Sequence, residues 1–244
     1  MNPSKTSKLL NSQKLKKVSI KNVICPDQKV DTLATDNKGF LIKKTFNNWQ
    51  RKTNLNSSNH RIILVLESPH IEEFKNSIGP AKGITGKNIA NYISMVLGNS
   101  ILSPNTNYDL ILMNAIQYQC SMGVKPIYFR TLAFIHLWFD GGKRDFIYRI
   151  INLKLKKDDV LINACTKGNI SNCKEYYKKT LTKKNIKLIL KIKRSLNFNK
   201  KNNYLKGLIN DIYYLFKNKI PCKCYETNHP SSWYNSNSRL IKKL

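Results

Sequence analysis

Three polar side chains that can carry out chemistry follow short aliphatic segments at distant points in the chain. Glu67 ends the run RIILVLE, Asn114 ends the run DLILMN, and His229 closely follows the run CKCYET. A carboxylate can orient water or stabilise a developing cation, and a neutral imidazole can donate a hydrogen bond to a developing anion. A carboxamide can both donate and accept hydrogen bonds. The three side chains are therefore candidates for one shared chemical site.

The segments that must position these residues alternate between strand and helix patterns. The predicted strands cover 61–67, 109–113, 159–164 and 222–227, and the predicted helices cover 87–97, 127–139, 173–195 and 203–218. This alternation predicts an α/β fold of three layers with a central, mainly parallel four-stranded sheet. Ligands bind beyond the carboxyl ends of the strands in such sheets, so we expect Glu67, Asn114 and His229 to converge there.

The rest of the chain divides by composition into three parts. Residues 1–20 are polar and rich in lysine, which predicts a flexible basic arm. Residues 21–60 are expected to form a helical extension, with a helix within 38–54 that packs on the core. Residues 61–244 hold all four predicted strands and form the main domain.

The charge of the chain points to a large polyanion as its partner. Lys and Arg number 43 against 14 Asp and Glu, which gives a net charge of +29. The excess is uneven: residues 141–219 carry +16 and residues 1–60 carry +9, whereas residues 61–140 carry +1 and residues 220–244 carry +3. Basic surface around a near-neutral chemical site suits a phosphate backbone, although solvated lysines on helix faces are an alternative.

The sequence contains no signal for a membrane or for a disulfide scaffold. No apolar run reaches the roughly 18 residues that a membrane span needs, and the first residues lack the apolar core of a secretory signal. The six cysteines are scattered without a repeated C-x-x-C spacing. We therefore expect a cytoplasmic protein with reduced thiols, no membrane partner, and no metal or other cofactor.

The ordered motifs LVLESPH, GITGKNI, LILMNAIQ and TNHPSSW resemble those of the uracil-DNA glycosylase superfamily across residues 61–244. The resemblance implies a uracil-DNA glycosylase-like fold and a monofunctional, monomeric DNA glycosylase. Such an enzyme extrudes a base from DNA and hydrolyses its N-glycosidic bond, leaving an abasic site. The partner is then DNA, as a duplex with a flipped base or as a single strand.

The resemblance also assigns roles to individual residues. Glu67 and His229 become the catalytic pair: Glu67 orients water or stabilises the cationic sugar, and His229 donates to the leaving base. Asn114 reads the base edge, and His70 and Ala81 stand at base-binding positions. Each of the first three residues has a structural alternative, because Glu67 can cap a strand end, Asn114 a helix or turn, and His229 a turn.

A second group of residues is expected to grip DNA, because small-residue loops allow a close approach to the backbone. These residues are Ser68, Pro69, Gly83, Gly86, Lys87, Ser231 and Ser232. Trp233 stands where the family commonly carries an apolar wedge that fills the hole left by the flipped base. The alternative for Trp233 is an ordinary place in the hydrophobic core.

The departures from the family pattern bear on the substrate. Ser68 stands where one branch places a catalytic Asp, and Cys25 lacks the C-x-x-C partner that an iron–sulfur cluster needs. His70 replaces a Tyr or Gly, and Ala81 replaces a base-stacking Phe, which predicts a larger pocket. A modified pyrimidine then becomes the expected base, for example glucosylated hydroxymethylcytosine of phage DNA in antiviral defence.

Three other functions stay open at this point. The first is a uracil-DNA glycosylase of base excision repair, and the second is a non-catalytic DNA-binding module. The third is a metal-dependent nuclease that uses Asp109, Asp140 and Asp145, whose spacing matches no recognised metal pattern. The sequence leaves the identity of the base and the preference for single or double strands undecided.

Overall fold

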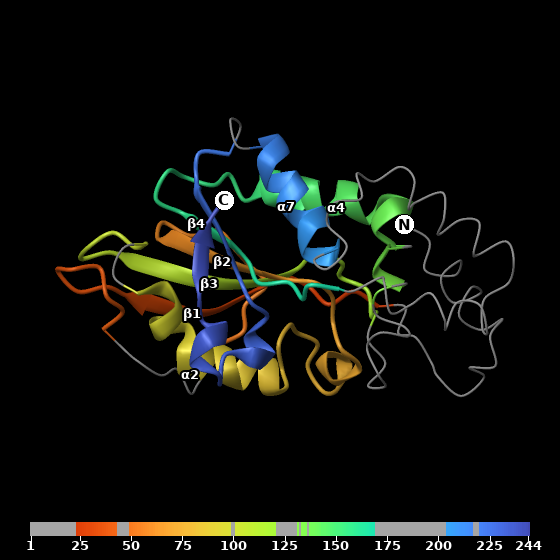
Figure 1. Cartoon of the computed structure of the whole chain (residues 1–244), viewed down its shortest axis with the longest axis horizontal. Helices are drawn as coiled ribbons and strands as arrows, with labels where there is room; N and C mark the ends of the chain where they lie inside the picture. Colours follow the sequence, from red (N-terminus) through yellow and green to blue (C-terminus); the bar gives the residue numbers. More distant parts are fainter. Residues whose placement is uncertain are drawn as a thin grey trace, which may run out of the picture.

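A six-stranded mixed sheet forms the middle of the computed structural model (Figure 1). The structure describes residues 23–42, 49–98, 101–120, 131, 133–135, 137–168, 204–216 and 220–244. Its strands are β1 (Gln28–Ala34), β2 (His60–Leu66), β3 (Asn107–Asn114), β4 (Val160–Asn163), β5 (Lys223–Thr227) and β6 (Ile241–Lys243), in the order β1-β3-β2-β4-β5-β6. Neighbours among β3, β2, β4 and β5 pair in parallel, and the two edge strands pair antiparallel.

The four predicted strands all form, but the prediction of a four-stranded sheet is wrong because two edge strands were missed. Strand β6 has only three residues, two of them lysines, so it lacks a strand pattern of its own. Strand β1 lies within the predicted helical extension. Its buried residues Val30 and Leu33 are three positions apart, and Val30 lies at a register shift between Lys29 and Asp31, so the simple alternation of a strand is broken.

The described part of the 38–54 segment is also not helical. Leu41 and Lys52 instead form isolated bridges, to Thr35 and Lys29. Around Leu41 and Lys52, pairing with β1 and the residue after it takes the place of the predicted helix, and residues 43–48 lie outside the described residues. The basic arm at 1–20 and the predicted helix at 173–195 lie outside the described residues.

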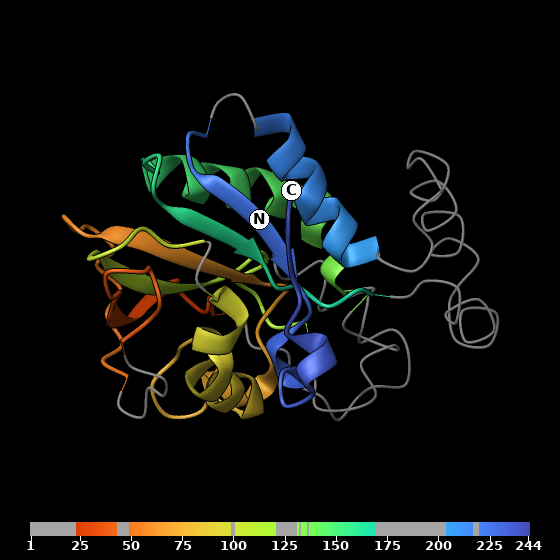
Figure 2. The ribbon, with the colours of Figure 1, turned by 60° about the vertical axis from the view of Figure 1, so that its left-hand side comes forward.

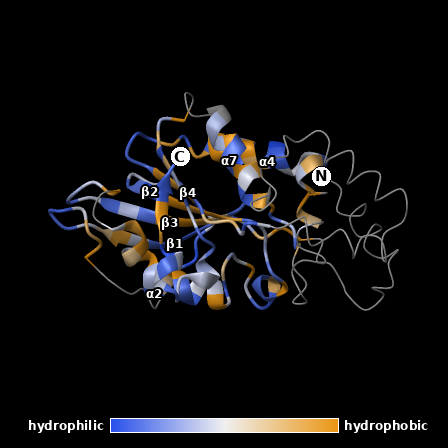
Figure 3. Cartoon of the chain, in the orientation of Figure 1, coloured by the Kyte–Doolittle hydropathy of each residue, from blue (hydrophilic) through white to orange (hydrophobic). Residues whose placement is uncertain are grey.

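Helices cover both faces of the sheet, as Figures 1 and 2 show. Helix α2 (Ile84–Leu97) packs on the face that carries Ile62, Leu64 and Leu66 of β2. Helices α4 (Lys143–Asn152) and α7 (Tyr204–Phe216) pack on the opposite face, with Ile63 and Val65. Strand β2 is buried on both sides because its side chains alternate between these two clusters. Figure 3 shows hydrophobic residues on the strands of the sheet and on parts of the helices.

A kink at Asp140 and Gly141 separates the predicted helix at 127–139 from α4. Residues 131, 133–135 and 137 are helical, and the chain continues through a π-helical turn, Trp138–Gly142, into α4. Asp140 and Gly141 leave helical geometry there, with φ of 103° at Gly141. The glycines therefore bend the chain between two helices, since a positive φ suits glycine. None of the described helices is both long enough and apolar enough to cross a bilayer.

Candidate active site

The carboxyl ends of the parallel strands bring Glu67 and His229 into contact. Oε2 of Glu67, after β2, lies 3.4 Å from Nε2 of His229, which follows β5. Main-chain hydrogen bonds continue past the strands and hold their ends in register. Ala115 N–H donates to the Leu66 carbonyl at 2.8 Å, and Ile116 N–H donates to the Glu67 carbonyl at 3.0 Å. Residues 162 positions apart in the sequence thus face each other because their strands end at the same edge.

His229 is held in one orientation by its own turn. Its Nδ1 accepts the Ser231 N–H at 3.2 Å and lies 2.8 Å from the Ser231 hydroxyl. Because Nδ1 accepts a main-chain N–H, the neutral ring carries its proton on Nε2, the atom that faces Glu67. Asn88 of α2 anchors this turn by donating to the Pro230 and Ser231 carbonyls at 3.0 and 3.2 Å.

Glu67 is a buried carboxylate, with 3% of its surface exposed. The Thr166 N–H donates to its Oε2 at 3.3 Å, from the chain that follows β4. Three strands, β2, β4 and β5, therefore contribute to the surroundings of one carboxylate oxygen. The distance of 3.4 Å to His229 is longer than an ordinary N–H···O bond, so the pair is close without being tightly bonded.

Glu73 is a second buried carboxyl at this edge, which the sequence analysis missed. It lies on the short 3-10 helix η1 (Ile71–Phe74) and receives hydrogen bonds from the Ala81 N–H and the Asn114 side chain. Burial, with the nearby charge of Glu67, raises the pKa of Glu73 to about 8, although the Ala81 and Asn114 bonds and the charge of Arg51 oppose the shift. Glu72 is exposed beside it, and only the turn of η1 decides which glutamate points inward.

Asn114 completes the cluster at the end of β3. Its Nδ2 lies 3.7 Å from Sγ of Cys25, and its Oδ1 is buried without a hydrogen-bond partner. Burial raises the pKa of the Cys25 thiol, so this neighbour is neutral. The Asn114 carbonyl accepts from Arg149 of α4 at 3.0 Å, and the same guanidinium contacts the buried carboxylate of Asp27 at 2.8 Å. Arg149 is therefore a positioning residue for the end of β3.

Buried polar atoms without partners gather at this edge of the sheet. Nine such side-chain atoms occur in the part of the chain that the structure describes, and four belong to this site: Ser68 Oγ, Glu73 Oε2, Asn114 Oδ1 and Thr166 Oγ1. Leaving a buried polar atom unpaired costs about 1–3 kcal/mol. Three others, on His60, Arg61 and Asp109, lie at the starts of β2 and β3. A ligand is one way to supply such missing partners.

The residues expected to grip DNA are divided between surface and interior. Gly83 and Lys87 are exposed at the start of α2, and Ser231 and Ser232 are half-buried. Ser68, Pro69 and Gly86 are buried. A Cβ on Gly86 would lie 1.9 Å from the Ala81 carbonyl oxygen, so close packing alone accounts for this glycine.

The two expected base-binding residues take on structural contacts. Ala81 is buried with φ of 53°, its N–H donates to Glu73, and its carbonyl accepts from Arg51 at 3.4 Å. Nδ1 of His70 accepts the Glu72 N–H at 3.2 Å and caps η1. Ala81 thus acts through its main chain, and a Phe there would meet both crowding and backbone strain. The enlarged pocket stays a prediction.

The prediction that Trp233 is an exposed wedge is wrong. Its side chain is 0% exposed, packs with the α2 cluster, and donates from Nε1 to the Asn228 carbonyl at 2.9 Å. The alternative of a core tryptophan is confirmed, because the 3-10 turn after His229 directs Trp233 inward. The next residue, Tyr234, is 68% exposed and is the large side chain that this loop presents to solvent.

The three aspartates of the nuclease hypothesis do not assemble. Asp109 starts β3 and contacts Lys29 at 2.8 Å, whereas Asp145 lies on α4 and contacts Arg149 at 2.9 Å. Asp140 lies in the bend before α4. No group of three or more His, Cys, Asp or Glu side chains in the described ranges can hold a metal ion.

Comparisons with known proteins add no name to this site, since no family model, curated protein or solved structure matches the chain.

Proposed function

We propose that this protein is a DNA glycosylase that flips a modified pyrimidine out of DNA and hydrolyses its N-glycosidic bond. The observation that carries the proposal is the contact between Glu67 and His229, 3.4 Å apart at the carboxyl edge of the sheet. A carboxylate and an N–H donor at one place match the two charges of the reaction. The sugar becomes cationic and the departing base becomes anionic as the bond breaks.

In this mechanism His229 and Glu67 act on opposite sides of the breaking bond. Nε2–H of His229 donates to an oxygen of the leaving base, and its orientation is supported by the Ser231 N–H on Nδ1. Glu67 stabilises the cationic sugar and orients the attacking water. Because the Glu67–His229 contact is long for a hydrogen bond, a base oxygen can compete for the Nε2 proton.

Two further features support a nucleic-acid substrate. The net charge of +29 favours a polyanion, since each phosphate neutralised by Lys or Arg releases counterions. The unpartnered atoms of Ser68, Asn114 and Thr166 are polar groups that a base can satisfy. Because these atoms are buried, a base reaches them only when the chain that covers them is displaced.

The substrate we favour is a 5-modified cytosine, such as the glucosylated hydroxymethylcytosine of phage DNA, which would place the protein in antiviral defence. Uracil in base excision repair is the alternative substrate. The residues at 70 and 81 motivate this choice, because His70 stands in place of the family's Tyr or Gly and Ala81 in place of its base-stacking Phe.

The test is a panel of duplexes that carry uracil, hydroxymethylcytosine or glucosylated hydroxymethylcytosine at one position. We expect alkali-labile abasic sites on a modified-cytosine duplex, in buffer that contains EDTA and without strand scission before alkali. Binding without abasic sites on every duplex would favour the non-catalytic module. Loss of activity in chelator would favour a metal-dependent reaction instead.

A further inference from the structure

Glu73 is the group at this edge that the proposed chemistry does not use. It is 7% exposed and lies beside Asn114, the residue expected to read the base. Its Oε2 has no hydrogen-bond partner, so the bonds from the Ala81 N–H and the Asn114 side chain fall on its other oxygen. If the Glu73 carboxyl is protonated, Oε2 is therefore the oxygen that can carry the proton.

The charges around Glu73 favour that protonated form. Burial raises the pKa of Glu73 to about 8, and the charge of Glu67 at the end of β2 adds to this shift. Arg51 opposes the shift, but its guanidinium donates to the Gln28 side chain at 3.0 Å and to the Pro80 carbonyl at 2.7 Å. The Cys25 thiol, whose pKa is raised by burial, adds no negative charge. On η1 itself, Glu72 contacts Lys75 at 2.8 Å and is exposed.

The polar groups of the cluster therefore form a pattern of donors and an acceptor. Oε2 of protonated Glu73 is a donor, and Oδ1 of Asn114 is an acceptor whose amide partner Nδ2 is already engaged by Glu73 and Cys25. Nε2–H of His229 is a second donor. The pairing edge of a cytosine offers two acceptors, O2 and N3, and one donor, the 4-amino group. Uracil differs at two of these positions, because its N3 is a donor and its O4 is an acceptor.

We propose that Glu73 is a specificity-determining residue that selects cytosine-type bases. Its carboxylic acid donates to N3, while Oδ1 of Asn114 accepts from the 4-amino group and His229 donates to O2. This inference rests on the proposed glycosylase function and narrows its substrate to bases that keep the 4-amino group. Uracil-type bases place an N3–H against the acid proton and O4 against the Asn114 oxygen, so both contacts become repulsive.

The inference predicts a preference that depends on pH. Loss of the Glu73 proton replaces the donor with an acceptor, which disfavours N3 of cytosine and suits N3–H of uracil. The preference should therefore be greatest below pH 8 and decline above it. Titration of His229 does not produce this change, because both bases present the same O2 to it.

The experiment compares two duplexes that differ only in the pairing edge of one base, 5-hydroxymethylcytosine and 5-hydroxymethyluracil. Single-turnover rates of base release are measured between pH 6 and 9.5. In the wild type, the cytosine-to-uracil ratio should fall above about pH 8 by as much as tenfold per pH unit, following the protonated fraction of Glu73. In Glu73→Gln, the amide keeps an N–H donor, so the ratio should stay high and constant with pH.

Glu72→Gln is the matched control, because the neighbouring glutamate is exposed and should leave the pH dependence unchanged. A wild-type ratio that is constant with pH, or that changes equally in Glu73→Gln, overturns the role of Glu73 while base release still supports the glycosylase. If neither these duplexes nor the glucosylated one releases a base at any pH, the proposed function fails, and this inference fails with it.

Discussion

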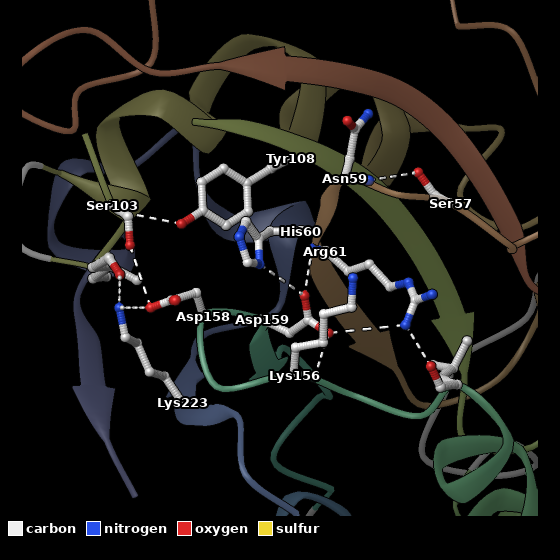
Figure 4. A network of polar contacts seen from close by, with 12 residues as sticks. Ser57, Asn59, His60, Arg61, Ser103, Tyr108, Lys156, Asp158, Asp159 and Lys223 are labelled. Carbon is white, nitrogen blue, oxygen red and sulfur yellow. Dashed lines mark hydrogen bonds and ion pairs between the residues drawn. The ribbon is translucent and has the colours of Figure 1, made fainter. Parts of the chain in front are cut away.

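Buried acidic side chains have different surroundings at the two ends of the parallel strands. At the amino ends, Asp159 accepts the Arg61 N–H at 2.8 Å and the Lys156 N–H at 2.7 Å, and its oxygens lie within 4 Å of His60 and Arg61 (Figure 4). Nearby, Ser103 contacts the hydroxyl of Tyr108 at 2.9 Å, and Lys223 contacts Asp158 at 3.6 Å. These contacts join the starts of neighbouring strands.

At the carboxyl ends, Glu67 lies near enough to Glu73 for its charge to act on the pKa of Glu73. The difference appears in the pKa directions. Burial would raise the pKa of Asp109, at the amino ends, but hydrogen bonds from Lys29, Ser57, Asn59 and Thr32 lower it overall. The pKa of Glu73 is raised to about 8. Hydrogen-bond donors therefore favour the charged form of Asp109 at one end of the sheet, whereas burial favours the neutral form of Glu73 at the other.

The largest effect on base release is expected when a carboxylate at the carboxyl ends of the strands becomes a carboxamide. Glu67→Gln keeps the shape but removes the charge that stabilises a cationic transition state. Base release under single-turnover conditions should fall at least 100-fold, which corresponds to about 2.7 kcal/mol, while DNA binding survives. The free energy of unfolding should change by less than about 1 kcal/mol. An unchanged rate would remove Glu67 from the chemistry.

A carboxylate-to-carboxamide change at the amino ends of the strands should lower stability and leave base release unchanged. Asp159→Asn replaces an oxygen that accepts a main-chain N–H with an NH₂ group, and it leaves the Arg61 guanidinium without its carboxylate. The free energy of unfolding should fall by about 2–3 kcal/mol. Denaturant titration measures this loss, and base release by the folded fraction should be unchanged. If Asp159→Asn instead slows base release and leaves the free energy of unfolding unchanged, the proposed difference between the two ends of the strands is wrong.

Glu73 should make stability depend on pH. Because its pKa is raised from 4.5 to about 8, the folded state binds the proton more tightly than the unfolded chain does. Its contribution to stability is therefore complete below about pH 4.5 and is lost as pH rises through 8. Between these limits the unfolding free energy of the wild type should decrease by up to about 1.4 kcal/mol per pH unit relative to Glu73→Gln. If the unfolding free energies of the wild type and Glu73→Gln change with pH in the same way, the raised pKa of Glu73 is contradicted.

The smallest effect is expected at the loop that carries His229. Tyr234→Ala removes an exposed ring that can stack where a flipped base leaves the duplex. Release of a paired base should slow about fivefold, which corresponds to about 1 kcal/mol of activation free energy. Release from a single strand should change little. Trp233→Ala is the contrasting variant, since loss of this buried ring should lower the melting temperature. Equal slowing of Tyr234→Ala on both substrates would exclude a wedge role.

The sequence by itself determined the layered α/β class, the four aliphatic strands and the position of Glu67, Asn114 and His229 after three of them. Local signals suffice for these features, because continuous aliphatic runs bury a strand on both faces and Pro or Asn ends it. Strand β1 was not predictable in this way, since its register shift breaks the alternation and its pairing with β3 joins residues about 75 positions apart.

Only the tertiary structure decided which polar and aromatic side chains enter the interior. Glu72 and Glu73 are equivalent in the sequence, as are Trp233 and Tyr234 as large rings after the histidine motif. The 3-10 turns after β2 and β5 bury Glu73 and Trp233 and expose their neighbours. The pKa of Glu73 and the free oxygen of Asn114 follow from that burial, because both depend on desolvation and on partners that come from distant strands.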